Sequence, residues 1–303
     1  MAESIVSIGV PTYRRPELLR LALESIANQT YHDIEVCVSD NATPGSQVEA
    51  VIDEYRSRIP NLKFVRQAVN IGAVPNLMYL LQQAHTPYFM WLADDDVLSP
   101  RYVEMLVKQL EADRDAVCAC GYTMRVGDVY APTRYRTSNF SQRSALLRIA
   151  SFLWRTNDFF YYGLHRTDVL RRAEFSGYSW LNAGEILNWC YVYLCDMVLA
   201  GKVVLCDDQS VFYQIKVDTR KHYYVGVGKS LLDILKTLIR RLNVHYLYWR
   251  KIAEQLSPVA LIVAVPVSVA SLLREYSFDL AVRAVQKLNR SVRRRLGMPV
   301  PAP

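Results

Sequence analysis

The sequence predicts an α/β protein with a doubly wound, mostly parallel sheet and a helical extension at its C-terminal end. Short apolar runs alternate with amphipathic segments as far as Ala116, which is typical of parallel sheets. From residue 229 onward only helical periodicity is present. Apolar residues make up 51% of the 303, so a sizeable core is available. We expect 1–125 and 126–228 to form two halves of one domain, and 229–303 the extension.

Four apolar runs in the first half have the composition of buried strands, namely 5–10, 34–39, 63–66 and 88–93. Segments with apolar residues on one side predict helices after each of them. These helices are expected over 15–28, 45–58, 73–84 and from Ser99 to about 112. Ser99 followed by Pro100 has the residue types of an N-cap and a first helical position.

Beyond Ala116 the regular alternation ends. We expect a polar, turn-like stretch over 130–141 and a polar loop over 216–228. Strands are predicted over 117–124, 159–164, 203–206 and 211–215. Helices are predicted over 142–155, briefly after Thr167, and over 185–200, 229–242, 244–256 and 278–296.

Charge and cysteine content indicate which partners and which cellular compartment to expect. The net charge is +7, but the 20 tyrosines are scattered and form no base-stacking motif, so we expect no nucleic-acid partner. Most of the 6 cysteines lie in apolar segments and are expected in the core, Cys118 and Cys120 among them. This fits a reducing compartment, and the N-terminus lacks a signal region. We therefore expect a cytoplasmic protein, with the inner face of a membrane as an alternative location.

Three consecutive aspartates, Asp94, Asp95 and Asp96, follow the apolar run 88–93. Their carboxylates repel one another, and a bound Mg²⁺ or Mn²⁺ would relieve that repulsion. Ligands of open α/β sheets bind outside the carboxyl ends of the strands, where Asp40 is also expected. The pattern predicts a metal site that could hold a diphosphate. A solvated acidic turn that caps the next helix would look the same in sequence.

Four short motifs stand out in the first half of the chain. They are Val-Pro-Thr-Tyr at 10–13, Ile-Glu-Val-Cys-Val-Ser-Asp-Asn at 34–41, Asn-Ile-Gly at 70–72 and Trp-Leu-Ala-Asp-Asp-Asp at 91–96. In order and spacing they resemble glycosyltransferase family 2, whose members have the GT-A fold and transfer sugars from nucleotide donors with inversion. The likeness is good over about residues 4–125, weaker to about 216, and absent beyond 229. It is specific for the family but not for the sugar.

The resemblance implies roles for individual residues. Asp40 would accept the N3–H of uracil or thymine, which implies a UDP- or TDP-sugar donor. The aspartates would bind ribose and metal, with Asp95 as the first choice of direct ligand beside Asp94 and Asp96. The family's second acidic group after this strand is missing, because the chain reads Asp-Asn-Ala-Thr-Pro at 40–44. Further nucleotide-sugar contacts are implied for Pro11, Thr12, Tyr13, Arg15, Asn70 and Gly72, and His222 could help to hold the diphosphate.

An inverting transferase needs one base to deprotonate the acceptor hydroxyl. Glu185 is the first candidate, because it stands at a predicted helix N-terminus in the region where the family commonly has an aspartate. A glutamate in the first turn of a helix is also favoured by the helix dipole alone. Asp158 is the second candidate. His165 and Arg166 are interpreted as structural residues.

Glycosyl transfer to a glycan, a lipid-linked glycan or a small metabolite has two rival functions. A sugar nucleotidyltransferase would need a glycine-rich phosphate loop after the first strand, and 10–15 contains no glycine. A non-catalytic membrane- or partner-binding protein on a transferase fold would not need the aspartates. An uncharged run at 256–273, borderline in length for a membrane span, is followed by a basic segment. Four roles for the extension are therefore open: packing, homodimerisation, peripheral membrane contact or a true span.

Overall fold

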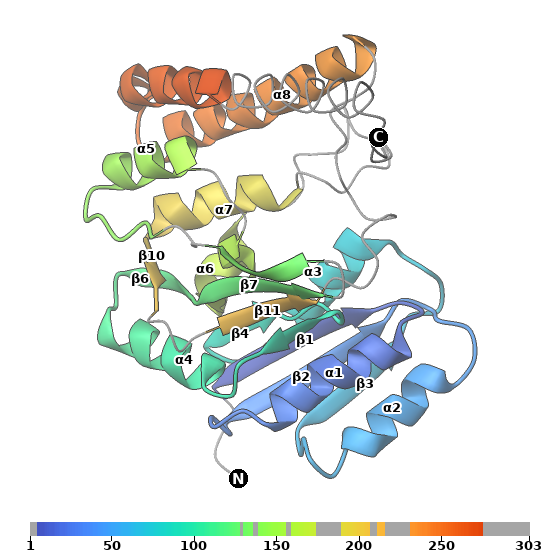
Figure 1. The fold of residues 1–303 in the computed structure, drawn as a ribbon. Coiled ribbons are helices and arrows are strands. Elements are labelled where there is room, and N and C mark those ends of the chain that lie inside the picture. The colour runs from blue at the N-terminus through green and yellow to red at the C-terminus, as the bar shows by residue number, and fades with distance from the viewer. Residues whose placement is uncertain are drawn as a thin grey trace, which may run out of the picture.

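The structure is a computed structural model that describes residues 5–127, 130–135, 139–155, 159–173, 189–206, 211–215 and 231–274 (Figure 1). Its main body is an α/β unit, and the C-terminal helices lie at the opposite end of the molecule from α2 (Gln47–Tyr55). No helix among the described residues is long and apolar enough to cross a bilayer.

The larger sheet has seven strands and is mostly parallel, as predicted. The strands are β1 (Val6–Thr12), β2 (Ile34–Asp40), β3 (Leu62–Arg66), β4 (Tyr88–Trp91), β6 (Ala116–Cys120), β9 (Leu164–Arg166) and β10 (Lys202–Leu205). Their order is β10-β6-β9-β4-β1-β2-β3, in which β9 is antiparallel to both neighbours and the other pairs are parallel. The carboxyl ends of β1, β2 and β4 therefore share one edge.

The helices cover both faces of this sheet. One face packs against α1 (Pro16–Ala27), α2 and α4 (Tyr102–Ala112), and the other against α3 (Ala73–Gln83) and the helices from the second half. The helices of the second half are α5 (Ala145–Arg155), α6 (Thr167–Arg172), α7 (Trp189–Ala200) and α8 (Leu231–Gln255), with 3₁₀ turns at η1 (Phe159–Tyr162) and η3 (Pro258–Ala260) and a last helix over 261–274.

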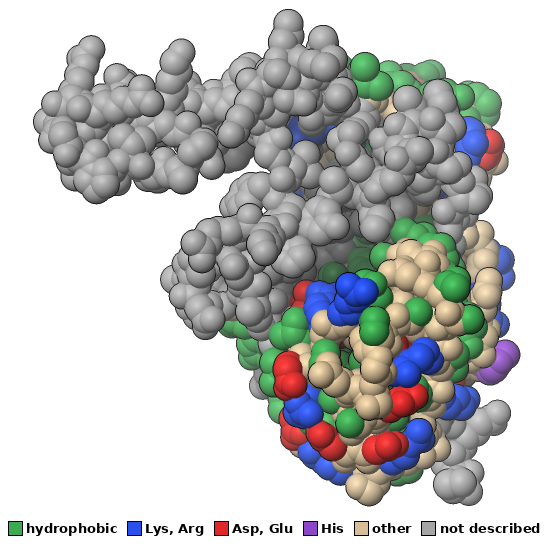
Figure 2. All heavy atoms as spheres, turned by 90° about the vertical axis from the view of Figure 1, so that its right-hand side faces the viewer, with side chains coloured by type: hydrophobic (Ala, Val, Ile, Leu, Met, Phe, Trp, Pro, Cys, Tyr) green, Lys and Arg blue, Asp and Glu red, His purple; other side chains and the backbone are tan. Residues whose placement is uncertain are grey.

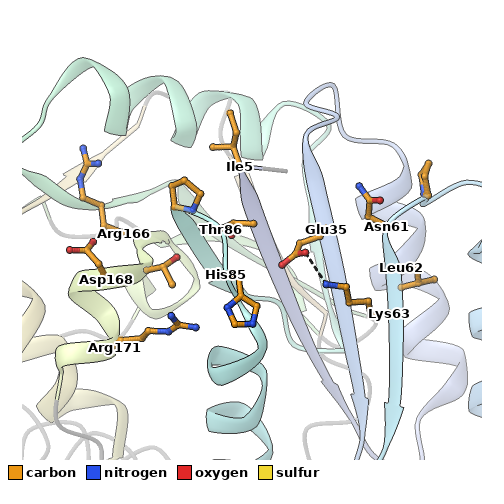
Figure 3. Close-up of a pocket in the computed structure, with 13 residues that line it drawn as sticks. Ile5, Glu35, Asn61, Leu62, Lys63, His85, Thr86, Arg166, Asp168 and Arg171 are labelled. Atoms are coloured by element: carbon orange, nitrogen blue, oxygen red, sulfur yellow. Dashed lines mark hydrogen bonds and ion pairs between the residues drawn. The ribbon is translucent and has the colours of Figure 1, made fainter. Parts of the chain in front are cut away.

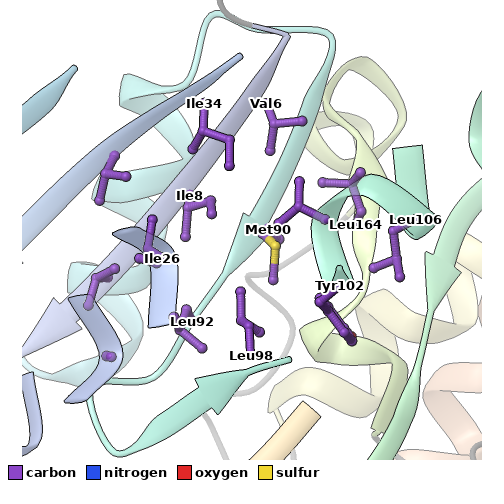
Figure 4. Close-up of a cluster of buried hydrophobic side chains, with 14 of the residues drawn as sticks. Val6, Ile8, Ile26, Ile34, Met90, Leu92, Leu98, Tyr102, Leu106 and Leu164 are labelled. Carbon is purple, nitrogen blue, oxygen red and sulfur yellow. The ribbon is translucent and has the colours of Figure 1, made fainter. Parts of the chain in front are cut away.

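Strand β4 shows why the sheet has two apolar faces. Successive side chains of a strand point to opposite sides. Met90 faces one buried cluster together with Val6 and Ile8 of β1 (Figure 4), while Phe89 and Trp91 belong to the other cluster. The strand is buried on both sides, which explains its continuous apolar sequence.

A second sheet was not predicted, and it corrects two expectations. Its strands are β5 (Asp96–Leu98), β7 (Tyr122–Gly127), β8 (Tyr130–Tyr135) and β11 (Val211–Ile215), in the order β5-β11-β7-β8. The single strand expected over 117–124 is wrong, because the chain leaves β6 at Gly121 and enters the second sheet as β7. The turn expected over 130–141 is also wrong, since β8 pairs with β7.

The expected helix start at Ser99 is wrong as well. The Ser99 N–H donates to the Val211 carbonyl (2.9 Å) and its hydroxyl accepts the Val211 N–H (3.0 Å), which continues the pairing of β5 with β11. The hydroxyl therefore caps no helix, and α4 begins only at Tyr102.

Further expectations for the rest of the chain can be compared with the structure. The strand predicted over 159–164 is instead η1 followed by β9. The two helices predicted on either side of Asn243 are one helix, α8, because asparagine costs a helix only a fraction of a kcal/mol. Cys118 and Cys120 are buried as expected, and burial raises the pKa of both thiols. The helix predicted over 278–296 lies outside the described residues.

A buried ion pair fastens α8 to α7. The Lys251 ammonium lies 2.6 Å from Asp196 Oδ2, and Gln255 donates to Asp196 Oδ1 at 2.8 Å. Both charged side chains are at least nine-tenths buried. Charges removed from water in this way depend on each other, because either one alone would be left uncompensated.

We expect Lys251→Met to lower the free energy of unfolding by about 3–5 kcal/mol, since Asp196 would remain buried without its partner. A second change, Asp196→Leu, should restore most of that loss. Urea unfolding of the full chain measures both effects. The matched control is Lys63→Met, whose exposed pair with Glu35 should be worth at most about 1 kcal/mol. Equal losses for Lys251→Met and Lys63→Met would contradict the assignment.

Candidate active site

Three strand ends meet at the carboxyl edge of the larger sheet. Thr12 ends β1 and lies in register with Asp40, the last residue of β2. The chain leaves β4 through Leu92 and Ala93 and reaches Asp94, whose Oδ2 accepts the Thr12 hydroxyl at 2.7 Å. The Asn41 N–H donates to the Thr12 carbonyl at 2.9 Å. The predicted convergence of Asp40 and Asp94 at one edge is thus present.

Arg15 supplies positive charge to the aspartates. It directly precedes Pro16, the first residue of α1, so the helix start holds it above the sheet edge. Its Nη2 lies 2.8 Å from Asp94 Oδ1, and its Nη1 lies 3.1 Å from Asp95 Oδ2. The guanidinium therefore bridges two adjacent carboxylates and offsets their mutual repulsion.

Burial dominates the electrostatics of Asp94, which is inaccessible to solvent. Loss of hydration raises its pKa from the ordinary 3.8 to about 7, while the charge of Arg15 acts in the opposite direction. The negative charge of Asp95 raises the pKa further, and hydrogen bonds from Thr12 and the Tyr13 backbone lower it. Asp94 is thus held in place by neighbours but is poorly suited to carry an unbalanced charge.

The other two aspartates differ in access. The Asp95 side chain is 26% exposed, whereas Asp96 is buried and opens β5 opposite Gln214 of β11. Within the described ranges, no three or more His, Cys, Asp or Glu side chains are grouped so as to hold a metal ion. Mg²⁺ is commonly held by only one or two carboxylates together with substrate phosphates and water. The accessible carboxylate of Asp95 beside Asp94 fits such an ion.

Asp40 is fully buried and oriented by two donors. Its Oδ2 lies 2.9 Å from Arg66 Nε, and its Oδ1 accepts the Thr43 N–H at 3.1 Å. Arg66 also pairs with Glu49 at 3.3 Å. Each carboxylate oxygen has a further lone pair, but the side chain has no solvent-accessible surface, so a ligand donor could reach it only after a covering residue moves.

Asn70 and Gly72 are tied to this edge by Asn41, which sequence reasoning quoted in a motif but gave no role. Asn41 Nδ2 donates to Asn70 Oδ1 (2.9 Å) and to the Gly72 carbonyl (3.2 Å), and its Oδ1 accepts the Ile71 N–H (2.9 Å). Gly72 has φ +88°, which favours glycine. The sequence did offer a signal for this role, because Asn41 directly follows the end of β2 and a short amide side chain readily bonds to nearby backbone groups.

The remaining predicted residues fall into three groups. Pro11 and Tyr13 lie beside Thr12 at the end of β1, and the Arg14 guanidinium lies 4.9 Å from the centre of the Tyr13 ring. His165 is buried in the sheet, and burial lowers its pKa to about 4, so it is uncharged at neutral pH. Arg166 donates to the carbonyls of β6 and α4. Glu185, Asp158 and His222 lie outside the described residues.

A cavity of about 920 Å³ lies at the opposite, amino-terminal edge of the sheet (Figure 3). Lys63 and Glu35 form an ion pair on its wall at 3.1 Å. Arg166 and Arg171 also line it, but both donate to backbone carbonyls of neighbouring elements. Because open α/β sheets bind ligands at the carboxyl ends of their strands, the site is assigned to the aspartate edge rather than to this cavity.

The chain belongs to glycosyl transferase family 2, whose family model matches residues 7–172, more than half of its length. Over 115 residues it is 33% identical to the abequosyltransferase RfbV of Salmonella typhimurium, covering 37% of this chain and 34% of that protein. Over 120 residues it is 30% identical to the chondroitin synthase of Escherichia coli, covering 39% of this chain and 17% of the synthase. The matched part thus spans about a third, or less, of these relatives.

Solved transferase structures share the fold. S. aureus TarS 1–349 in complex with UDP-GlcNAc has a TM-score of 0.63 at 18% identity, over 90% of this chain and 73% of that chain. The mannosyltransferase PcManGT from Pyrobaculum calidifontis, in complex with GDP-Man and Mn²⁺, has a TM-score of 0.52 at 16% identity, over 98% and 84%. The family and the fold expected from the sequence motifs are confirmed.

The raised pKa of Asp94 predicts a pH dependence of stability. The folded state keeps this proton up to about pH 7, whereas the unfolded chain releases it near pH 3.8. Between these values the folded state binds more protons, so stability falls as the pH rises. Relative to Asp94→Asn, the native chain should lose up to about 4 kcal/mol between about pH 4 and 7.

Urea unfolding in EDTA, repeated across this pH range, measures the difference between the two proteins. Asp53→Asn is the matched control, because Asp53 is an exposed aspartate on α2. Its profile should run parallel to that of the native chain. A constant difference between Asp94→Asn and the native chain would show that Asp94 does not hold its proton in the fold.

Proposed function

We propose that this chain transfers a sugar from a UDP- or TDP-sugar to an acceptor hydroxyl with inversion at the anomeric carbon. The observation that carries this proposal is the buried Asp94, held between Thr12 and Arg15 at the carboxyl edge of the sheet, with the accessible Asp95 beside it. Membership of family 2 supports it. The complex of TarS with UDP-GlcNAc supports a nucleotide-sugar donor on this fold.

Asp95 is proposed to hold a Mg²⁺ or Mn²⁺ ion, with Asp94 next to it. When bound, such an ion acts as a Lewis acid and stabilises the negative charge that develops on the leaving diphosphate. Thr12 keeps Asp94 in its orientation through the 2.7 Å hydrogen bond. The complex of PcManGT with Mn²⁺ supports a divalent ion on this fold.

Arg15 is the residue best suited to contact the diphosphate. Its side chain is 42% exposed and already lies against the two carboxylates. A guanidinium offers several donors in a plane that matches phosphate oxygens. Exchange of a carboxylate partner for a phosphate partner would keep its charge balanced and would leave Asp95 free to hold the ion.

Asp40 and the loop fixed by Asn41 are proposed to hold the nucleoside. The donors from Arg66 and Thr43 fix the plane of the Asp40 carboxylate, and after a covering residue moves an additional lone pair can accept the N3–H of uracil or thymine. The hydrogen bonds from Asn41 keep Asn70 and Gly72 beside this position. Guanine and adenine present other hydrogen-bonding edges, so they should bind less well.

The acceptor base is proposed to be Glu185, with Asp158 as the alternative. Inversion requires one base on the face of the sugar opposite the leaving group. Because both residues lie outside the described ranges, this assignment rests on the sequence and is tested by mutation.

A thermal-shift panel tests the donor class. UDP or TDP with Mn²⁺ should raise the apparent melting temperature more than GDP or ADP does, because a ligand that binds only the folded state stabilises it. The same nucleotides in EDTA should give a smaller shift. A stronger response to a purine nucleotide would remove the role given to Asp40.

Asp95→Asn tests the metal site. We expect the fold to be preserved, since the change relieves charge repulsion, but the metal-dependent part of the UDP shift and the turnover of the donor should be lost. Asp53→Asn is the matched control and should behave like the native chain. Slow release of UDP from a UDP-sugar panel provides a turnover readout without a known acceptor. Full turnover in excess EDTA would refute the metal role.

Glu185→Gln tests the base. It should retain the donor-induced thermal shift and lose about 10²–10⁴-fold in transfer rate, the usual cost of removing a general base. Asp158→Asn is measured beside it under the same conditions. If Glu185→Gln is unchanged and Asp158→Asn is slow, the role moves to Asp158.

A further inference from the structure

The last described helix, over 261–274, exposes several large apolar side chains, while Leu272 is buried and Leu261 and Val267 pack partly against the core. In a helix packed on a soluble protein, such side chains normally face the core. Here the exposed positions from η3 through this helix carry no charge until Arg274 at its end. The large exposed residues are Val259 (69%), Ile262 (73%), Val263 (40%), Val269 (44%) and Leu273 (64%).

The opposite face of this helix is buried and consists mainly of small residues. Ala264, Ser268 and Ser271 are buried, as is Ala260 in η3. Trp249 of α8 donates its indole N–H to the Ser268 hydroxyl at 3.0 Å. Small residues allow the helix to lie close to α8, and α8 is fastened to α7 by the buried Lys251 ion pair. The helix therefore presents its apolar face in a fixed direction.

The α8 helix, which packs against helix 261–274, also has exposed apolar side chains. The α8 helix exposes Ile239, Leu242 and Tyr246, whose spacing places them on one side of that helix. Figure 2 shows hydrophobic side chains gathered at the top of the molecule, the end at which Figure 1 places α8. Large apolar side chains exposed on one face of a helix favour an interaction site over a solvated face.

One end of the apolar face is bordered by an aromatic ring and a positive charge. The Arg274 guanidinium lies 4.2 Å from the centre of the Trp154 ring and donates to the Trp154 carbonyl at 2.5 Å. The Trp154 side chain, at the end of α5, is 41% exposed. Tryptophan and arginine at the border of an apolar surface are the residues enriched where a bilayer meets water.

The sequence that follows the helix adds positive charge. Residues 275–303 contain six basic and two acidic side chains, a net charge of +4. The basic residues are Arg283, Lys287, Arg290, Arg293, Arg294 and Arg295. A basic segment that follows an apolar helix in the sequence is attracted to anionic lipid headgroups. A second copy of the chain would instead bring two segments of like charge together.

We propose that the outward face of helix 261–274 docks on an anionic lipid surface, with Ile262 among the side chains that enter it and the basic sequence directed at the headgroups. Because the other face is packed against α8, only the outer side chains enter the lipid. This orients the chain so that the α/β unit, at the opposite end of the molecule in Figure 1, extends away from the surface. The inference is independent of the proposed sugar transfer.

The test uses the full chain and vesicles of equal parts phosphatidylglycerol and phosphatidylcholine, with phosphatidylcholine vesicles for comparison. The native chain should sediment with the anionic vesicles at low salt. Ile262→Glu should lower the partition coefficient about tenfold or more, because a charge would replace the aliphatic group that enters the lipid. Leu21→Glu, an equivalent change at an exposed position of α1, should leave binding unchanged.

A second variant tests the charge. Arg293→Gln, Arg294→Gln and Arg295→Gln together should lower binding to anionic vesicles about a hundredfold, since each basic residue near such a surface contributes about fivefold. Added salt should weaken the native chain's binding by screening. Circular dichroism must show that Ile262→Glu melts like the native chain.

Several results would overturn the proposal. These are no binding of the native chain at low salt, equal binding to neutral vesicles, or equal binding by Ile262→Glu. An oligomer of the native chain that dissociates on Ile262→Glu, measured by sedimentation velocity without lipid, would assign the face to a second copy instead.

Discussion

The hydrogen bond from Thr12 to the buried Asp94 is the contact on which the arrangement of the site depends. It joins the ends of β1 and β4 and places the aspartates beside α1. A carboxylate without access to water needs such partners, because burial penalises its charged form. Arg15 provides the compensating charge, and the start of α1 at Pro16 holds it there. The carboxyl group of Asp94 is therefore positioned by the ends of two strands and by the start of one helix.

The second half of the chain completes the fold by covering one apolar face of the parallel sheet. Helices α5 and α7 pack on the face that carries Phe89 and Trp91, and Trp91 stacks on Tyr161 with ring centres 5.1 Å apart. The α8 helix is added to this layer through Lys251 and Asp196. The outermost helix packs mainly through small residues together with Leu272, and its other large side chains, among them Ile262 and Leu273, remain exposed.

Much of the fold could be predicted because buried strands and amphipathic helices alternate regularly in the first half. Apolar runs such as that of β4 are buried on both faces, and Pro16 marks the start of α1. Prediction failed where hydrogen bonds between distant segments decide the outcome. The Ser99 hydroxyl has the residue type of a helix cap, but it accepts the N–H of Val211, which lies far away in the sequence. Local propensity contains no information about such a partner.

The sequence by itself determined the family, the alternation of strands and helices, and the presence of Asp40 and Asp94 at one sheet edge. These features depend on residue types and on the common direction of parallel strands. The tertiary structure decided the rest: the bridge that Arg15 forms between Asp94 and Asp95, the link from Asn41 to Asn70, and the outward apolar face of helix 261–274. Each of these depends on which segments come into contact, and contact is set by packing in three dimensions rather than by spacing along the chain.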